Sequence, residues 1–287
     1  MKVLITGANG MLGRTLCRVL KDVEVIPTDR DTMDIAKADE VDRVLRQHQP
    51  DVVIHCAAMT AVDLCETEKE NAFLINAVGS SNVAVACHTI GARLIAISTD
   101  YVFDGSGEKS YSEYDVPNGG NTVYGQSKWA GEQLIRTHCP NHVIARVAWL
   151  YGPGGPSFVH TMIKLADGTR PALKVVDDQV GNPTSTDAVA RALQEILKHP
   201  SIAGTFHLTC EGEVTWCEFA KKIFAIKGIK QTVLPCSTEE YPRPAPRPKN
   251  SRLEKLNLRL YGLKPMPSWD AELQTVLANP EFYRILD

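Results

Sequence analysis

The chain opens with the stretch KVLITGANGMLG, residues 2–13. Its first five residues are mostly aliphatic and predict a strand, three glycines follow at G-x-x-G-x-x-G spacing, and the residues after them predict an amphipathic helix. A strand, a glycine turn and a helix in this order are the context that a dinucleotide-binding motif requires. Gly7 permits the tight turn, Gly10 lets the backbone approach a pyrophosphate, and Gly13 lets the helix pack closely on the strand. We therefore predict that these glycines form a dinucleotide cradle.

The second predicted strand, residues 23–27, ends close to a carboxylate and a guanidinium. Asp29 lies roughly 20 residues past the glycines, where a carboxylate binds the hydroxyls of the adenosine ribose. Arg30 follows it directly, and Arg14 follows the last glycine. Because two guanidinium groups suit a 2′-phosphate, the sequence leaves NADP(H) and NAD(H) both open as cofactors.

Strand and helix patterns alternate over the first 150 residues. The alternation predicts an α/β fold, a Rossmann-type doubly wound parallel sheet that forms an NAD(P)-binding domain over residues 1–152. Further strands are expected at residues 52–58, 93–97 and 142–150, and one long helical stretch from Glu66 to about Ile90. The third strand ends in Ala57 and Ala58, two small residues that let a flat cofactor lie against the backbone.

The stretch GPGGP, residues 152–156, marks a change of composition. Shorter helix and strand patterns follow it. We predict that residues 153–287 form mainly a smaller mixed α/β lobe that binds substrate, with some segments returning to the first domain. The proline-rich stretch 241–248 suits neither a helix nor a central strand. It is expected to be an extended segment, either a plain connector or a carrier of Arg247 to an anionic substrate.

Tyr124 and Lys128 stand four residues apart at the start of another predicted helix. Residues at this spacing share one helix face. A nearby cation favours phenolate, so we expect Lys128 to lower the pKa of Tyr124 below about 10 and to suit it for proton transfer. Thr99 and Asp100 directly follow the fourth strand. Since the carboxyl ends of parallel strands gather at one edge, these four side chains are expected in one cleft.

Composition excludes several classes of partner. A net charge of −3 and an apolar fraction of 44% indicate a globular protein without a nucleic-acid or membrane partner. No apolar run approaches the roughly 18 residues of a membrane span. The eight cysteines are scattered without a C-x-x-C pair, which suggests free thiols in the reducing cytoplasm. No residue is singled out as a metal ligand.

Together these motifs resemble the extended short-chain dehydrogenase/reductase family over nearly the whole chain. The residues that carry the likeness are Gly7, Gly10, Gly13, Asn76, Thr99, Tyr124 and Lys128. Longer strings resemble the branch of that family that reduces a dTDP-linked 4-oxo sugar. They are AAMTAVD (57–63), STDYVFDG (98–105), VYGQSKWAGE (123–132), WLYG (149–152), DQVGNPT (178–184) and RPKNSRL (247–253).

The resemblance implies reduction of dTDP-4-dehydro-L-rhamnose to dTDP-L-rhamnose, with hydride from NADPH or NADH. It implies that Tyr124 donates the proton, that Lys128 holds the nicotinamide ribose and that the Thr99 hydroxyl polarises the carbonyl. It also implies that Asp100 and Trp149 contact the dTDP-sugar, and that Met11 and Leu12 contact the cofactor.

Some members of the family dimerise through a metal held by acidic residues, one of them early in the first helix. Here that helix carries Arg14, Thr15, Cys17 and Arg18, so we expect no metal-bridged dimer and leave the oligomeric state open. The alternative functions are another epimerase or reductase of the family, or a non-catalytic regulatory subunit with this fold. A dehydratase places Asp-Glu after the threonine, whereas Asp100 is followed here by Tyr101, which argues against elimination.

Overall fold

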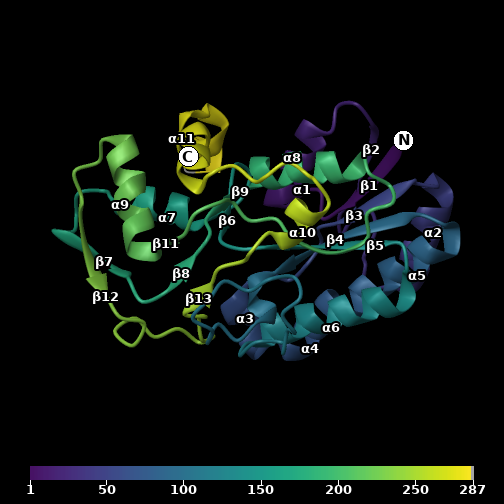
Figure 1. The fold of residues 1–287 in the computed structure, drawn as a ribbon, viewed down its shortest axis with the longest axis horizontal. Coiled ribbons are helices and arrows are strands. Elements are labelled where there is room, and N and C mark those ends of the chain that lie inside the picture. Colours follow the sequence, from purple (N-terminus) through teal and green to yellow (C-terminus); the bar gives the residue numbers. More distant parts are fainter. Residues whose placement is uncertain (286–287) are drawn as a thin grey trace.

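A parallel sheet of six strands forms the centre of the molecule (Figure 1). The computed structural model describes residues 1–285. The strand order is β10-β5-β4-β3-β1-β2, and every neighbouring pair is parallel. The strands are β1 (Lys2–Thr6), β2 (Glu24–Pro27), β3 (Val52–His55), β4 (Arg93–Thr99), β5 (His142–Val147) and β10 (Gly204–His207). The predicted Rossmann-type parallel sheet is confirmed.

The chain reverses its direction of travel across the sheet next to β1. It passes from β1 to β2 on one side, and then returns to place β3 on the other side of β1. In open α/β sheets, ligands bind outside the carboxyl ends of the strands at such a switch point. The glycine turn after β1 and the two alanines after β3 both lie at this place.

Helices cover both faces of the sheet. On one face α1 (Met11–Val19) packs against α8 (Thr186–Leu197), and on the other α2 (Ala38–His48) and α6 (Val123–His138) pack against α5 (Ser80–Ile90). Figure 1 shows these two helix layers above and below the strands. The apolar sides of α1 and α8 meet β1 in one buried cluster, and α2 and α5 meet β3 and β4 in another. Burial of these stripes holds the layers together.

The single helix expected from Glu66 to about Ile90 is divided. α3 (Val62–Thr67) ends at Glu68, whose backbone leaves the helical region at φ −107° and ψ 54°. α4 (Lys69–Phe73) then passes through a π-helical turn, Leu74–Gly79, into α5. Such wide turns often mark functional sites. Here the turn holds Asn76, whose side chain bonds both backbone groups of Met59 at 2.8 and 3.1 Å.

By length and composition alone, Lys69–Ile90 is apolar enough to cross a membrane. In the structure this segment packs against α6 and α2, and its polar side chains Asn76 and Ser80 are buried and hydrogen-bonded. A covering helix of a sheet core passes the same composition test. The segment therefore belongs to the helix layer of the fold.

The strand expected over 142–150 is shorter. β5 ends at Val147, and Trp149 adopts a positive φ of 48°, which a strand does not accommodate. After this bend, β6 (Leu150–Tyr151) pairs with β9 (Thr184–Ser185) away from the central sheet. The bend turns the Trp149 indole toward the second half of the chain, where it contacts Gly181.

The second half builds a smaller lobe around Val159, Phe219, Phe224 and Leu273. Its elements are α7 (Phe158–Leu165), β7 (Ala172–Val176), β8 (Val180–Gly181), β11 (Val214–Thr215), α9 (Trp216–Lys227), β12 (Thr232–Cys236), β13 (Asn250–Ser251), α11 (Trp269–Ala278) and a 3-10 turn (Pro280–Ile285). α8, β10 and α10 (Leu256–Leu260) instead pack on the first domain. Residues 286 and 287, the end of the expected lobe, lie outside the described residues.

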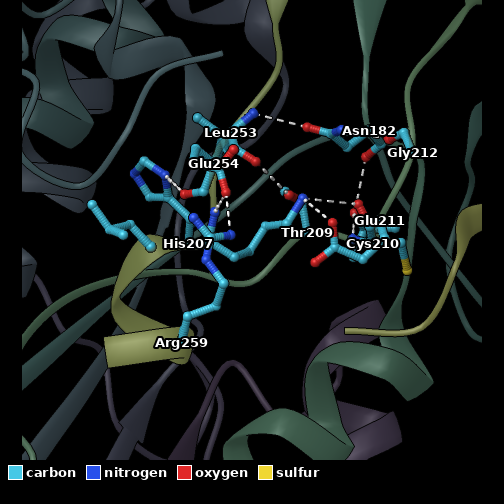
Figure 2. A network of polar contacts seen from close by, with 12 residues as sticks. Asn182, His207, Thr209, Cys210, Glu211, Gly212, Leu253, Glu254 and Arg259 are labelled. Carbon is cyan, nitrogen blue, oxygen red and sulfur yellow. Dashed lines mark hydrogen bonds and ion pairs between the residues drawn. The ribbon is translucent and has the colours of Figure 1, made fainter. Parts of the chain in front are cut away.

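A polar network fixes the segment that follows β13 (Figure 2). Asn182 accepts from the backbone N–H of Leu253 at 2.8 Å and donates to the carbonyl of Gly212 at 2.6 Å. His207 donates from Nδ1 to the carbonyl of Glu254 at 2.8 Å, and the Glu254 side chain pairs with Arg259. The network therefore ties the lobe, the central sheet and the chain after β13 together.

Candidate active site

Fourteen of the residues that the sequence predicts for the site line one cavity of about 720 Å³. The cavity lies at the carboxyl ends of β1, β3 and β4, beside α6. These residues are Gly7, Gly10, Met11, Leu12, Gly13, Asp29, Arg30, Ala57, Ala58, Thr99, Asp100, Tyr124, Lys128 and Trp149. The fold therefore brings together side chains that are up to 142 positions apart in the chain (Gly7 to Trp149).

The glycine turn has room for backbone only. Gly7 has a φ of +63°, and a Cβ atom there would lie 2.8 Å from the Cα atom of Ala57. A Cβ atom on Gly13 would lie 2.2 Å from the carbonyl oxygen of Gly7. Helix α1 thus starts close against β1, with its free N–H groups at the cavity. This is an arrangement that binds phosphate groups, so the turn fits a dinucleotide pyrophosphate.

Asp29 and the two arginines lie at the far end of the cradle. The Asp29 carboxylate accepts from the N–H groups of Asn9, at 2.9 Å, and Arg30, at 2.8 Å, so it also ties β2 to the glycine turn. Arg14 donates from Nε to the carbonyl of Asn9 at 2.7 Å, whereas the exposed Arg30 side chain borders the cavity. Only Arg30 of the two lines the cavity.

The N-terminus of α6 is held tightly at the end of β4. Thr122 accepts from the Gly125 N–H at 3.0 Å, and Glu66 on α3 accepts from the Val123 N–H at 2.9 Å. A Cβ atom on Gly125 would lie 2.2 Å from the carbonyl oxygen of Tyr101, so only glycine lets the helix approach this closely. The ring of Tyr124 then packs edge-to-face on Tyr101, with centroids 5.4 Å apart.

Lys128 lies one turn beyond Tyr124 and is buried. Its ammonium donates to the carbonyl of Ile97 on β4 at 2.7 Å. Burial lowers the pKa of Lys128 to about 8, although the nearby Glu132 carboxylate raises it. Two of its three N–H donors remain for a ligand in the cavity.

The expected lowering of the Tyr124 pKa is wrong for this chain. Burial raises the pKa of Tyr124 above its usual value, with a smaller lowering effect from the hydrogen bond of Thr99. The Lys128 ammonium is directed at the backbone of β4 instead. Because the phenol stays protonated at neutral pH, it is ready to give a proton to a stronger base rather than to take one.

A second cavity of about 450 Å³ adjoins the first. Tyr101, Trp149 and Trp216 line both cavities, and the two indole rings stack with centroids 3.4 Å apart at 9°. The rest of its wall includes Phe158, Tyr241, Arg243 and Arg247. The second cavity is thus rich in aromatic rings and guanidinium groups, and it meets the first cavity at Tyr101, on which Tyr124 packs.

This chain is similar to several known proteins over most of its length. A family model described as "RmlD substrate binding domain" matches residues 1–281. A solved dTDP-4-dehydrorhamnose reductase from Clostridium acetobutylicum is 45% identical, with a TM-score of 0.94 over 97% of this chain and 99% of that chain. A second one, from Bacillus anthracis in complex with NADP, is 41% identical, with a TM-score of 0.94 over 96% of this chain and 98% of that chain. The spore coat polysaccharide biosynthesis protein SpsK of Bacillus subtilis is 43% identical over 266 residues, covering 92% of this chain and 93% of the relative.

The chain belongs to the dTDP-4-dehydrorhamnose reductase family. Its 287 residues span nearly the full length of each of these relatives. The resemblance seen in the sequence strings is thereby confirmed at the level of the family.

Sequence reasoning missed one prominent residue of this reductase-family site. Trp216 reads as a core residue of an amphipathic helix, but it is the first residue of α9 and its ring faces both cavities. Its Nε1 donates to Gln179 at 3.1 Å, and Gln179 donates to Thr238 at 3.0 Å. Helix periodicity carried no signal for it, because the first turn of a helix can face along the axis as well as into the core.

The proline-rich segment 241–248 forms neither helix nor strand, and its Arg247 does not lie free in the second cavity. The guanidinium forms two hydrogen bonds with the Asp63 carboxylate on α3, at 2.8 and 2.9 Å. The segment thereby connects the lobe to the first domain across the cavity. Among residues 1–285, no group of three or more His, Cys, Asp or Glu side chains is arranged to hold a metal ion.

Proposed function

We propose that this protein reduces the 4-oxo group of dTDP-4-dehydro-L-rhamnose, giving dTDP-L-rhamnose, a precursor of cell-surface polysaccharide. NADPH or NADH supplies the hydride when bound. The observation that carries the proposal is the meeting of two cavities at Trp149 and Trp216, beside Tyr124 and Thr99. One cavity fits a dinucleotide, and the other fits a sugar nucleotide whose hexose reaches the junction.

The second cavity has the chemistry that a nucleoside diphosphate requires. A thymine ring stacks on aromatic side chains such as Phe158 and Tyr241. The guanidinium group of Arg243 suits a diphosphate, because an arginine–phosphate pair combines charge with directed hydrogen bonds, whereas Arg247 is paired with Asp63. We propose accordingly that residues 1–152 hold the dinucleotide and residues 153–287 mainly the sugar nucleotide.

The proposed roles follow from where charge changes during the reaction. The C4 oxygen becomes an alkoxide as hydride arrives, and Tyr124 donates a proton to it. Thr99 polarises the same oxygen, while Lys128 donates to the nicotinamide ribose. Asp100 and Trp149 bound the sugar, and the residues from Gly7 to Gly13, with Asp29, Arg30, Ala57 and Ala58, hold the dinucleotide.

An epimerase of the same fold returns the hydride to its substrate, and a regulatory subunit transfers none. The combination of Thr99, Tyr124 and Lys128 in one cavity supports a catalyst over a regulatory subunit. We also propose that the protein acts in the cytoplasm, where its eight free thiols remain reduced. The absence of a metal-bridged dimer stays a prediction.

The direct test supplies dTDP-4-dehydro-L-rhamnose with NADPH, and separately with NADH, and follows the absorbance of the reduced nicotinamide. We expect stoichiometric oxidation and a product that matches dTDP-L-rhamnose by chromatography. No oxidation with either cofactor, in protein that binds them, would favour the regulatory subunit. Conversion of the sugar without net oxidation would favour the epimerase.

A further inference from the structure

Asp100 is a buried carboxyl group with one oxygen that lacks a hydrogen-bond partner among the described residues. It is the first residue of the 3-10 turn Asp100–Val102 after β4, and its side chain is 4% exposed. Oδ1 accepts from the Thr99 hydroxyl at 2.9 Å. Oδ2 is buried and has no hydrogen-bond partner within residues 1–285. An unpaired buried carboxylate oxygen is costly, which raises the question of its protonation state.

The Thr99 hydroxyl has one hydrogen and two acceptor positions. Its oxygen accepts from the Tyr101 N–H at 3.2 Å, and its hydrogen is taken by Asp100. While Asp100 is ionised, Thr99 therefore has no hydrogen left to donate to a substrate carbonyl or to Tyr124. When Asp100 is protonated, its carboxyl group donates to the Thr99 oxygen instead of accepting from it, and so occupies the second acceptor position of that oxygen. The Thr99 hydrogen is then free to point toward the cavity.

The charged groups around Asp100 are occupied elsewhere. On α6, Lys128 donates to the carbonyl of Ile97, and Tyr124 is uncharged. On the segment after β12, Arg247 is paired with Asp63 of α3. Burial raises the pKa of Asp100 to about 6, against lowering effects of the Ser251 and Thr99 hydroxyls. Tyr101, next in the chain, is likewise held neutral by burial.

We propose that Asp100 takes part in the reaction as a neutral carboxylic acid, and that it supplies the reaction's proton through Thr99 and Tyr124. The proposal rests on the proposed reductase function and adds to it the source of the proton. Ser251 contributes by lying beside the carboxyl group. It is kept there by β13, which pairs with β8, and by the network around Leu253 and Glu254 shown in Figure 2.

The step balances as a chain of transfers. C4 of the sugar receives the hydride, and the electron pair of its carbonyl bond moves to the oxygen. Until that point the Thr99 hydroxyl donates to the same oxygen and polarises it. The oxygen takes the proton of Tyr124, the phenolate then takes the proton of Thr99, and Thr99 takes the proton of Asp100. Asp100 is left as the carboxylate and regains a proton from water after the product leaves. The dinucleotide is oxidised, the ketone is reduced, and one proton is consumed.

The test is the pH dependence of kcat/KM for sugar reduction between pH 5 and 8, measured with NADPH. Because the neutral form of Asp100 is required, activity is full at low pH and falls as pH rises through about 6. Asp100→Asn cannot release a proton, so it should lose this decline and lower kcat on the order of 10²-fold. Ser251→Ala removes a hydroxyl beside the carboxyl group that lowers the pKa of Asp100, so it should move the decline to higher pH. Asp42→Asn, an exposed carboxyl on α2, is the matched control and should leave the profile unchanged.

Two results would overturn the relay. The first is an Asp100→Asn variant that folds and binds NADPH but whose kcat/KM still falls with pH as in the wild type. The second is a Ser251→Ala variant whose kcat/KM falls at the same pH as in the wild type, or at a lower pH. If Asp100→Asn fails to fold, the pH dependence of kcat/KM in Ser251→Ala still tests the proton relay. Absence of NADPH oxidation at every pH would instead contradict the proposed function itself, so the two failures are distinguishable.

Discussion

At the scale of single residues, the centre of the site is a phenol that keeps its proton. Burial between α6 and the turn after β4 raises the pKa of Tyr124, and Thr99 only partly offsets that effect. A reductase needs a proton donor at this position, so the raised pKa suits the reductive direction. The spacing of Tyr124 and Lys128 predicted a shared face, but the direction of the pKa shift depends on packing from β4 that the spacing does not contain.

The first prediction concerns this proton donor. Tyr124→Phe removes the hydroxyl and keeps the ring that packs on Tyr101. We expect a loss in kcat of about 10²–10⁴-fold with NADPH affinity unchanged, because the hydroxyl contributes to proton transfer. Steady-state kinetics and a fluorescence titration of NADPH measure the two quantities. Near-normal turnover would remove Tyr124 from the mechanism.

The second prediction concerns the charge of Lys128. Its ammonium is lost as pH rises through about 8, so we expect NADPH to bind more weakly above that pH than below it. Lys128→Ala should weaken NADPH binding at pH 7, lower kcat and abolish this pH dependence. Calorimetric titration at several pH values measures the affinity. Unchanged affinity in the variant would contradict the proposed contact with the nicotinamide ribose.

The third prediction separates the two cofactors. The exposed Arg30 side chain borders the dinucleotide cavity. If it contacts a 2′-phosphate, Arg30→Ala should raise KM for NADPH about tenfold or more while changing KM for NADH little, because a charge-assisted hydrogen bond contributes about 1.5–3 kcal/mol. Equal losses with both cofactors would show that Arg30 does not distinguish them.

At the scale of elements, α6 is held to β5 by a buried ion pair one turn beyond Lys128. Glu132 accepts from Arg146 at 2.8 and 2.9 Å and from Ser98 at 2.6 Å. Burial opposes ionisation of this carboxyl, but Arg146 holds the pKa of Glu132 below its usual range. Arg146 also donates to the neutral ring of His207, whose pKa burial lowers to about 3. The pair therefore fixes the helix that carries Tyr124 and Lys128.

The fourth prediction tests this support. Glu132→Gln leaves the Arg146 charge buried without its partner, so we expect a loss in unfolding free energy of about 3–5 kcal/mol. Urea unfolding followed by circular dichroism measures it. Asp42→Asn, which breaks the exposed pair with Arg46, serves as the control and should leave the midpoint unchanged. Equal effects of the two substitutions would mean that the buried pair does not hold the helix.

At the scale of the whole molecule, the main feature is a pair of cavities that meet at the stacked rings of Trp149 and Trp216. The alternation of strands and helices predicted the parallel sheet, and the glycine turn with the strand ends predicted the dinucleotide cavity. The stack of Trp149 on Trp216 was beyond prediction, because it depends on the bend after β5 and on where α9 starts. The ion pair between Arg247 and Asp63 could not be predicted either, because the two residues are distant in the chain and local sequence patterns carry no information on such contacts.

The position of β10 in the sheet could not be predicted from the sequence either. A strand near residue 205 is predictable from its composition, but its place beside β5 in the first sheet is decided by the packing of α8 on α1. That return of the chain adds the strand at one edge of the sheet. It also brings His207 to Arg146 and to the segment that carries Ser251.

The central claim is that hydride passes from the dinucleotide to C4 of the dTDP-sugar and remains there. The most direct measurement uses NADPH carrying deuterium at the nicotinamide C4, prepared separately with the label on each face, and analyses the product by mass spectrometry and proton NMR. We predict one deuterium at C4 of dTDP-L-rhamnose from one of the two labelled cofactors and none from the other. Product without deuterium from either cofactor, or a sugar converted without oxidation of NADPH, would contradict the account.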